Sequence, residues 1–295
     1  MAIDERHAEV ALAVQATLGE GPVWDDRRNE LFFVDIVAGR VHRFCPERGE
    51  HGSFAVGPSV GALALREDGG LVLAAHDGFF LVEADGTGLA PLSAFRSDAE
   101  LVRFNDGKAD PHGRFVAGTM DWDGERPLGS LYLLEPGGAV SVLLEGVTIS
   151  NGLAWSERGD VVYYIDTPRR SVDAFDFDAA SGAFANRRVV ASFEGPGSPD
   201  GMTIDDEGCL WVALWGGSRV ERIDPRSGEH LAVVHVAASQ VTSAAFGGPR
   251  RDVLYLTTAR RGLDEASLAG QPHAGDLFAV EAGVAGPVAH RFAAS

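Results

Sequence analysis

Cysteine, long apolar runs and a leader-like N-terminus are all missing or scarce in this sequence. The chain has two cysteines in 295 residues, Cys45 and Cys209, and they fall in different sequence repeats. Neither a disulfide nor a cysteine metal site is therefore expected. No apolar run approaches the ~18 residues of a membrane span, and residues 1–7 contain no apolar signal core. The expected protein is cytoplasmic and does not cross a membrane.

Positive charge is also in short supply. There are 25 Lys and Arg residues against 43 Asp and Glu residues, which gives a formal net charge of −18. A chain this acidic is repelled by nucleic acid and by anionic membrane surfaces, so neither is an expected partner. The charge favours binding of cations, although solubility alone would also account for it.

Several common catalytic motifs are absent as well. No two histidines have the spacing of a helical zinc motif. Ser198 and Ser218 lack the nucleophile-elbow pattern, so Ser-His-Asp hydrolysis is not supported. Trp24, Trp155 and Trp211 are expected in the core, and only Trp215, just past a strand end, is expected near a cavity.

What the sequence does have is glycine, 37 residues of it, and a regular repeat of short apolar strands. Turn-forming residues precede each strand core, and the mean period of about 45 residues is that of propeller blades. The cores are residues 31–34, 71–74, 115–118, 161–164, 210–213 and 254–257. Without helices between them, these units predict an all-β fold: one six-bladed β-propeller domain over residues 1–295, with four-stranded antiparallel blades around a central channel. An unrelated β-sandwich is the alternative.

Two details of the ring can be predicted. Residues 9–14 are expected to close the last blade by pairing near residues 284–292. Residues 264–273 are expected to be an insertion in the sixth blade, with a short helix over one mouth of the channel.

Polar residues recur where the innermost strands begin. The positions in phase are Glu20, Val60, Asp106, Asn151, Asp200 and Thr242. Because the inner strands of a propeller run in one direction, their starts ring one mouth of the channel. Carboxylates and an amide gathered there would be costly without a cation, and a hard divalent ion would neutralise them. Taken singly, Glu20 could be a surface acid, and the Asn151 and Asp200 dipeptides with glycine could be ordinary turns.

Seven motifs then point to a family. They are LGEGP at 18–22, RFNDGKADP at 103–111, AGTM at 117–120, GSLY at 129–132, SNGL at 150–153, PDGM at 199–202 and FGG at 246–248. Together they resemble the senescence marker protein/gluconolactonase family, also called the regucalcin family, whose members have the six-bladed fold.

The resemblance implies roles for particular residues. It implies one divalent metal ion held by Glu20, Asn151 and Asp200, and a sugar lactone held by Arg103 and Asn105. Asp123 falls where some members have a glutamate that contacts substrate. Repeat phase selects Asp106 for the channel whereas the family selects Asn105; a one-residue bulge would reconcile the two, with Asp106 supporting the loop.

The function implied is a metal-dependent sugar lactonase that hydrolyses a pentono- or hexono-lactone to the aldonic acid. The metal would act as a Lewis acid and Asp200 as the general base. Oxygen ligands suit Ca²⁺, Mg²⁺ or Mn²⁺ and are also accepted by Fe²⁺ and Zn²⁺. The expected partner is a small-molecule sugar lactone; the sugar, the ring size, the native metal and the oligomeric state stay open. The alternatives are a phosphotriesterase-like hydrolase and a non-enzymatic calcium-binding propeller.

Overall fold

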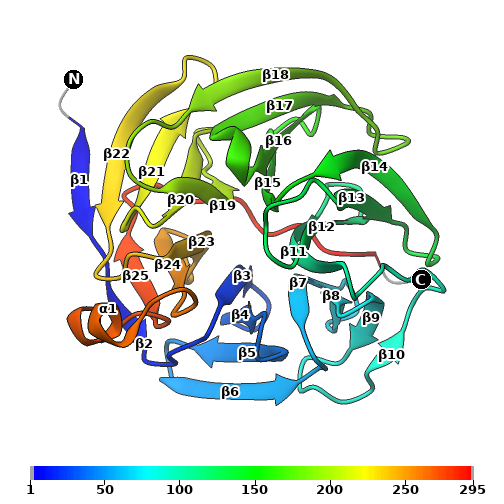
Figure 1. Cartoon of the computed structure of the whole chain (residues 1–295), viewed down its shortest axis with the longest axis horizontal. Helices are drawn as coiled ribbons and strands as arrows, with labels where there is room; N and C mark the ends of the chain where they lie inside the picture. The colour runs from blue at the N-terminus through cyan, green and yellow to red at the C-terminus, as the bar shows by residue number, and fades with distance from the viewer. Residues whose placement is uncertain (1–2, 294–295) are drawn as a thin grey trace.

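Six antiparallel sheets surround one central channel in the computed structural model, which describes residues 3–293 (Figure 1). This confirms the six-bladed β-propeller. The first blade consists of β3 (Gly19–Asp25), β4 (Glu30–Asp35), β5 (Arg40–Cys45) and β6 (Glu50–Ala55). The second consists of β7 (Val60–Leu65), β8 (Leu71–Ala75), β9 (Gly78–Val82) and β10 (Ala90–Pro91). The third consists of β11 (Val102–Ala109), β12 (Phe115–Asp121), β13 (Gly129–Leu134) and β14 (Val140–Val147).

Blades four to six follow the same order from the channel outward. The fourth blade consists of β15 (Ser150–Trp155), β16 (Val161–Asp166), β17 (Ser171–Phe177) and β18 (Phe184–Ser192). The fifth consists of β19 (Ser198–Ile204), β20 (Leu210–Trp215), β21 (Arg219–Asp224) and β22 (Glu229–His235). The sixth consists of β23 (Val241–Gly247), β24 (Val253–Thr258) and β25 (Leu277–Glu281), and β2 (Glu9–Leu12) is its outermost strand. The six strand cores read from the sequence all lie in the second strand of a blade. A short 3₁₀ turn, η1 (Thr167–Arg169), follows β16.

The N-terminal segment ties the last two blades together. β2 pairs antiparallel with β25, and β1 (Asp4–His7) adds to the fifth blade by pairing parallel with β22. The prediction that the N-terminal strand pairs near residues 284–292 was wrong. That segment instead crosses the far end of the channel and reaches β7, where the amide of Phe292 donates to the carbonyl of Leu65 at 2.8 Å.

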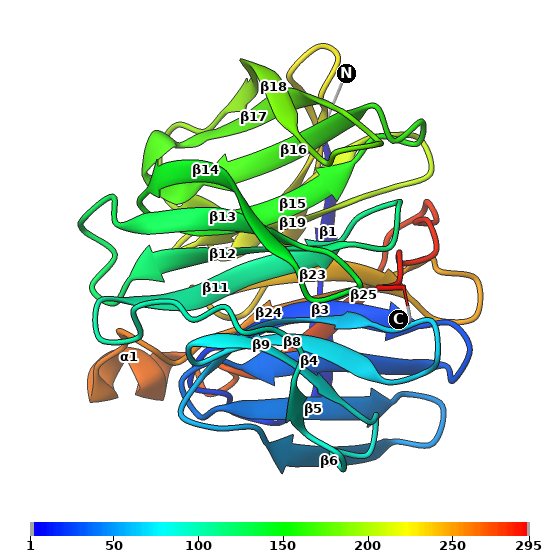
Figure 2. The same ribbon diagram turned by 90° about the vertical axis from the view of Figure 1, so that its right-hand side faces the viewer.

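The insertion in the sixth blade contains the helix α1 (Glu265–Gly270). Asp264 caps it, its side chain accepting from the amide of Ser267 at 2.8 Å. The helix projects from one face of the disc beside the sixth blade, away from the channel axis, and residues 284–292 lie at the opposite face (Figures 1 and 2). A helix over the channel mouth was therefore not found.

The core lies between neighbouring blades. Phe32 and Val34 of the first blade pack with Leu63 and Leu73 of the second, and similar apolar clusters fill the other seams. Strands buried on both faces explain the continuous apolar runs that marked them in the sequence. Cys45 and Cys209 are both free and buried. Within residues 3–293, no helix is long and apolar enough to span a membrane.

Every inner strand is irregular near its start. In each blade the pairing of the innermost strand with the second strand shifts register once. The shifts lie between Glu20 and Val23 in β3, Val60 and Ala62 in β7, Phe104 and Asp106 in β11, Ser150 and Leu153 in β15, Pro199 and Met202 in β19, and Val241 and Ser243 in β23. A bulge frees a residue from the ladder and redirects its side chain. Six bulges at one level therefore set apart one end of the channel, which we call the upper mouth.

Candidate functional site

Three of the predicted site residues sit on separate blades at the upper mouth. Glu20, Asn151 and Asp200 lie at the starts of β3, β15 and β19, and each is at least 95% buried. Asn151 and Asp200 fall in the slipped stretch of their strands, and Glu20, which pairs with Val34, is the last paired residue before the slip in β3. The repeat phase therefore located them correctly within the fold.

The Asn-Gly and Asp-Gly pairs are not turns. Asn151 and Gly152 lie inside β15, and Asp200 and Gly201 lie inside β19. A Cβ atom on Gly152 would lie 2.8 Å from the amide nitrogen of Met202, closer than atoms can pack. Glycine here lets adjacent inner strands approach each other, which draws the side chains before it together.

A chain of hydrogen bonds links the third and fourth blades at this mouth. Arg103 donates to Oδ1 of Asn105 at 2.6 Å, and Nδ2 of Asn105 lies 2.8 Å from the carbonyl of Ser150 and 3.3 Å from Oδ1 of Asn151. Nδ2 of Asn151 in turn donates to Thr167, at 2.8 Å. Asn151 is thus held with its amide nitrogen on Thr167 and its oxygen toward Asn105.

The bulge in β11 decides between Asn105 and Asp106. Pairing of β11 with β12 skips Asn105, so the extra residue is the asparagine that the family resemblance selected. Asp106 is also buried, and its Oδ1 accepts from the amide of Gly107 at 2.6 Å. The prediction that Asp106 supports a loop was wrong. Asp106 lies within β11 and contributes to the channel wall.

Electrostatics at the upper mouth favour the binding of positive charge. Burial, followed by the charge of Asp200, raises the pKa of Glu20 well above its usual range. Burial, followed by the charge of Asp106, does the same to the pKa of Asp200, although Asn151 and Arg103 oppose it. In the part of the chain that the structure describes, neither carboxylate forms a salt bridge. Repelling acids left unpaired in a buried site are stabilised by a cation.

The donor set fits a hard divalent ion. Two carboxylates and one amide oxygen are ligands of the type that Ca²⁺ and Mg²⁺ prefer. Among residues 3–293, no three His, Cys, Asp or Glu side chains are grouped so as to hold a metal. A metal ion here would therefore require the oxygen of Asn151 beside the carboxylates of Glu20 and Asp200, which is the set that the resemblance implies.

Arg103 has neighbours that sequence reasoning did not identify. Its guanidinium carbon lies 5.9 Å from the ring centre of Trp122, and a nitrogen of Arg261 is 3.5 Å from the carbonyl of Trp122. Burial and then the charge of Arg261 lower the pKa of Arg103 to about 10. Trp122 and Arg261 lie in loops after β12 and β24, where repeat phase gives no signal.

Asp123 is not brought into this network. It lies in the exposed turn between β12 and β13, and no hydrogen bond or salt bridge of its side chain is found in the described chain. The substrate contact implied for Asp123 therefore stays a prediction without a supporting contact.

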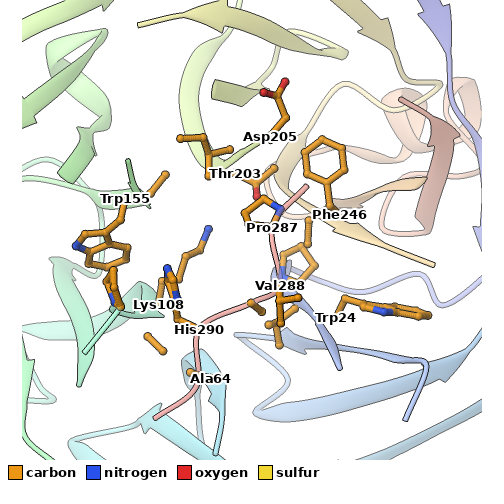
Figure 3. A pocket seen from close by; sticks show the side chains of 18 of the residues that line it. Trp24, Ala64, Lys108, Trp155, Thr203, Asp205, Phe246, Pro287, Val288 and His290 are labelled. Atoms are coloured by element: carbon orange, nitrogen blue, oxygen red, sulfur yellow. The ribbon is translucent and has the colours of Figure 1, made fainter. Parts of the chain in front are cut away.

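A cavity of about 360 Å³ occupies the other end of the channel, which we call the lower mouth (Figure 3). None of the six predicted site residues lines it. Trp24 and Trp155 do, each only 4% exposed, so the tryptophans expected in the core also form a cavity wall. Trp215, the one expected near a cavity, is not part of this lining and packs against the apolar seam of the first two blades.

Fold and upper mouth together define a class: six-bladed propellers with buried oxygen-bearing side chains and a buried arginine at one end of the channel. The family model described as SMP-30/Gluconolactonase/LRE-like region matches residues 18–260. This chain belongs to that family.

Named relatives and solved structures agree with the assignment. The chain is 40% identical over 268 residues to "Putative sugar lactone lactonase YvrE" of Bacillus subtilis, covering 90% of this chain and 92% of that protein. It is 41% identical over 278 residues to regucalcin of Bos taurus, covering 92% and 93%. A calcium-binding regucalcin structure from Agrobacterium tumefaciens superposes with a TM-score of 0.92 at 28% identity, over 99% of both chains. A luciferin-regenerating enzyme gives a TM-score of 0.90 at 34% identity, over 97% and 99%.

Proposed function

We propose that this protein is a metal-dependent sugar lactonase that opens an aldono-lactone to the aldonic acid. The observation that carries the proposal is the pair of buried, unpaired acids, Glu20 and Asp200, next to the hydrogen-bonded pair of Arg103 and Asn105. The first pair suits a cation, and the second suits a neutral molecule rich in hydroxyl groups. The relative named as a sugar lactone lactonase supports the same substrate class.

Arg103 and Asn105 would orient the lactone. The guanidinium offers several N–H donors, of which one is already held on Asn105 and on the backbone carbonyl of Phe104. Because these contacts fix the arginine, binding a sugar hydroxyl costs little further ordering. Trp122, near Arg103, would add an apolar surface for a sugar ring and exclude water from one side.

Asp200 would take the proton. Hydrolysis needs a base beside the carbonyl carbon, and burial raises the pKa of this carboxyl, which strengthens it as a base. Asp200 accepts a proton from the attacking water as the new C–O bond forms, and returns it to the ring oxygen as the ring C–O bond breaks. The products are a hydroxyl group and a carboxylic acid, and the acid ionises to the carboxylate and releases a proton. A divalent ion held by Glu20, Asn151 and Asp200 would supply Lewis-acid stabilisation of negative charge on the substrate oxygen.

The test is acid release from a lactone panel in weak buffer. D-xylono-, L-arabino-, D-galactono- and D-glucono-lactones are given to chelator-stripped protein, and again after Ca²⁺, Mn²⁺, Zn²⁺ or Fe²⁺ is restored. We expect turnover above the uncatalysed rate with at least one ion and one sugar, and its loss on chelation. No rate above background with any combination would contradict the proposal.

Calcium binding without catalysis is the second candidate, favoured by the structural relative described as a calcium-binding protein. In that case Ca²⁺ would raise the melting temperature while every lactone gave only background acid release. Replacement of Arg103 would then leave calcium affinity and all other measured properties unchanged. Paraoxon, a phosphotriester, belongs in the same assay because it reports the remaining alternative directly.

A further inference from the structure

The lower mouth contains a cavity that the proposed lactonase does not use. Its lining runs from Gly21 and Asp106 to the ends of the inner strands and does not include Glu20, Asn151 or Asp200, which lie at the strand starts. Its volume of about 360 Å³ falls in the range of sites that hold small organic molecules. Its walls include Trp24, Trp155, Phe246 and Val288 (Figure 3). Such walls suit an apolar ligand body.

The only lysine in the chain enters the middle of this cavity, whereas Arg158 is an exposed cation at its rim. All other 24 Lys or Arg residues are arginine, and Lys108 projects from β11 into the space between the aromatic walls (Figure 3). Its ammonium donates to the carbonyl of Met202, on β19, at 2.8 Å. An ammonium carries three donors, and this is the one hydrogen bond found for it among residues 3–293. Two N–H groups stay available to a ligand.

The polar groups around Lys108 determine which head group fits. Thr203 and Ser243 also line the cavity, and each brings a hydroxyl group that can donate a hydrogen bond. Asp106, two residues before Lys108 on β11, supplies an opposing charge next to the ammonium. A ligand carboxylate would therefore add an unbalanced charge to a poorly solvated space in an already acidic protein. A neutral acceptor, such as a carbonyl oxygen, adds none.

A strap formed by residues 284–293 crosses the outer end of the cavity. The amide of Gly286 donates to the carbonyl of Arg251 at 2.9 Å, and the amide of Phe292 donates to the carbonyl of Leu65 at 2.8 Å, so the sixth and second blades hold the strap. Between these anchors, residues 287–290 line the cavity and make no backbone hydrogen bond within the described chain. Val288, at their centre, is 45% exposed. The middle of the strap can move without breaking backbone pairing.

We propose that the lower mouth is a second ligand site, for a small neutral molecule with an apolar body and a carbonyl head group. The carbonyl oxygen accepts from Lys108 and from the hydroxyl of Thr203, and the body lies between Trp24, Trp155 and Val288. None of the residues proposed for lactone hydrolysis lines this site, so its ligand can be tested without a lactone.

Isothermal titration with three matched probes tests the proposal. The probes are 4-phenylbutan-2-one, 3-phenylpropionate, which replaces the acetyl group with a carboxylate, and propylbenzene, which has no head group. We expect the ketone to bind about tenfold more tightly than either of the others, the gain of one hydrogen bond to a charged donor. Equal affinity for ketone and propylbenzene, tighter binding of the carboxylate, or no binding of the ketone would overturn it.

Variants locate the head group. Lys108→Met keeps the apolar stem of the side chain. This variant should bind the ketone about tenfold more weakly than the wild type does and propylbenzene with unchanged affinity. Thr203→Val, which keeps the side-chain shape, should weaken the ketone two- to fivefold and serves if Lys108→Met does not fold. Arg158→Met, an exposed cation at the rim of the same cavity, is the control and should change nothing. Unchanged ketone affinity in folded Lys108→Met would contradict the role of Lys108.

The single lysine gives an independent readout. Lys108 carries the only side-chain amine that acetic anhydride can acetylate, and peptide mass spectrometry separates it from the N-terminal amine. The ketone should slow acetylation of Lys108 several-fold while the N-terminal amine reacts at the same rate. Equal rates at Lys108 with and without ketone would place the ketone elsewhere.

Discussion

The two ends of the channel are built from the same six strands but carry opposite chemistry. At the upper mouth the inner strands begin with Glu20, Asn105, Asn151 and Asp200, on bulges. A few residues later the regular parts of the same strands place aromatic and aliphatic side chains around Lys108. The bulges free polar side chains from the ladder, whereas regular pairing keeps the strand ends packed.

The ends also differ in how their charges are balanced. Glu20 and Asp200 repel each other and have no salt bridge in the described chain, so the upper mouth favours an added cation. At the lower mouth the charge of Asp106 acts on Lys108, and Asp205 is paired with Arg222 at 2.8 Å. The acids Glu20 and Asp200 therefore lack a salt-bridge partner, whereas the buried acids of the lower mouth lie near cations. The predictions below test whether that contrast holds.

The largest effect is expected from Asp200→Asn. The variant keeps the size of the side chain and removes the base, so lactone kcat should fall about 10³-fold. The metal-free protein should not lose stability, because one of three mutually repelling acids, Glu20, Asp106 and Asp200, is gone. The measurements are acid-release kinetics and the melting temperature in chelator. Asp206→Asn, the exposed neighbouring acid at the other end of the channel, is the control and should keep full kcat.

Arg103→Lys should lower kcat/KM about 10²-fold. An ammonium cannot hold Asn105 and a substrate hydroxyl with the fixed geometry of a guanidinium. Steady-state kinetics on the preferred lactone measure the loss. Arg126→Lys, which changes an exposed arginine paired with Asp121, controls for the substitution itself. If both variants retain wild-type kcat/KM, substrate is held elsewhere.

A change of a few degrees is expected from Glu20→Gln in chelator. Burial and Asp200 raise the pKa of Glu20, so the folded state binds more protons than the unfolded state. The stability tied to this group is then complete below the unfolded pKa and falls as pH rises toward the folded pKa. The melting temperature of the wild type should therefore decline from pH 5 to pH 8, and the melting temperature of the variant should decline less over the same range. At pH 8 the variant should melt roughly 2–4 °C higher, the shift that ~1 kcal/mol produces.

Added Ca²⁺ separates a role of Glu20 in binding the ion from a general effect of the substitution on stability. Saturating ion at 100 times its Kd should stabilise the wild type by about 2.7 kcal/mol and the variant much less. A variant with the wild-type pH slope and the wild-type response to Ca²⁺ would remove Glu20 from the site. Differential scanning calorimetry in matched buffers records both quantities.

Local pattern was enough to predict the propeller and the upper mouth. The 45-residue period comes from strands that contact only their neighbours, and the bulged residues recur at one phase of that period. The fold and the level of Glu20, Asn151 and Asp200 in the channel therefore followed from the sequence. Family resemblance supplied Asn105 where phase alone gave Asp106.

The remaining features depend on contacts between distant segments. Trp122 and Arg261 come from loops of different blades, and no repeat aligns them. The strap was misplaced because residues 284–292 have the apolar character of a strand but pair across the ring rather than along the last blade. Trp24 and Trp155 were correctly expected to be buried, yet burial does not tell a packed seam from a cavity wall.

The smallest effect is expected at Asp123, the one predicted substrate residue that the upper-mouth network does not include. Asp123 is exposed on the turn after β12, with no side-chain hydrogen bond found in the described chain, so Asp123→Asn should change KM by less than about threefold. Asp123→Glu gives the sharper measurement, because the longer side chain restores the acid that some family members carry there. If that variant lowers KM while Asp123→Asn leaves it unchanged, the turn approaches the substrate but aspartate is too short to reach it. A rise in KM of tenfold or more in Asp123→Asn would instead mean that the turn closes over the bound lactone, and the upper mouth would then extend from the strand starts onto the loop that also carries Trp122.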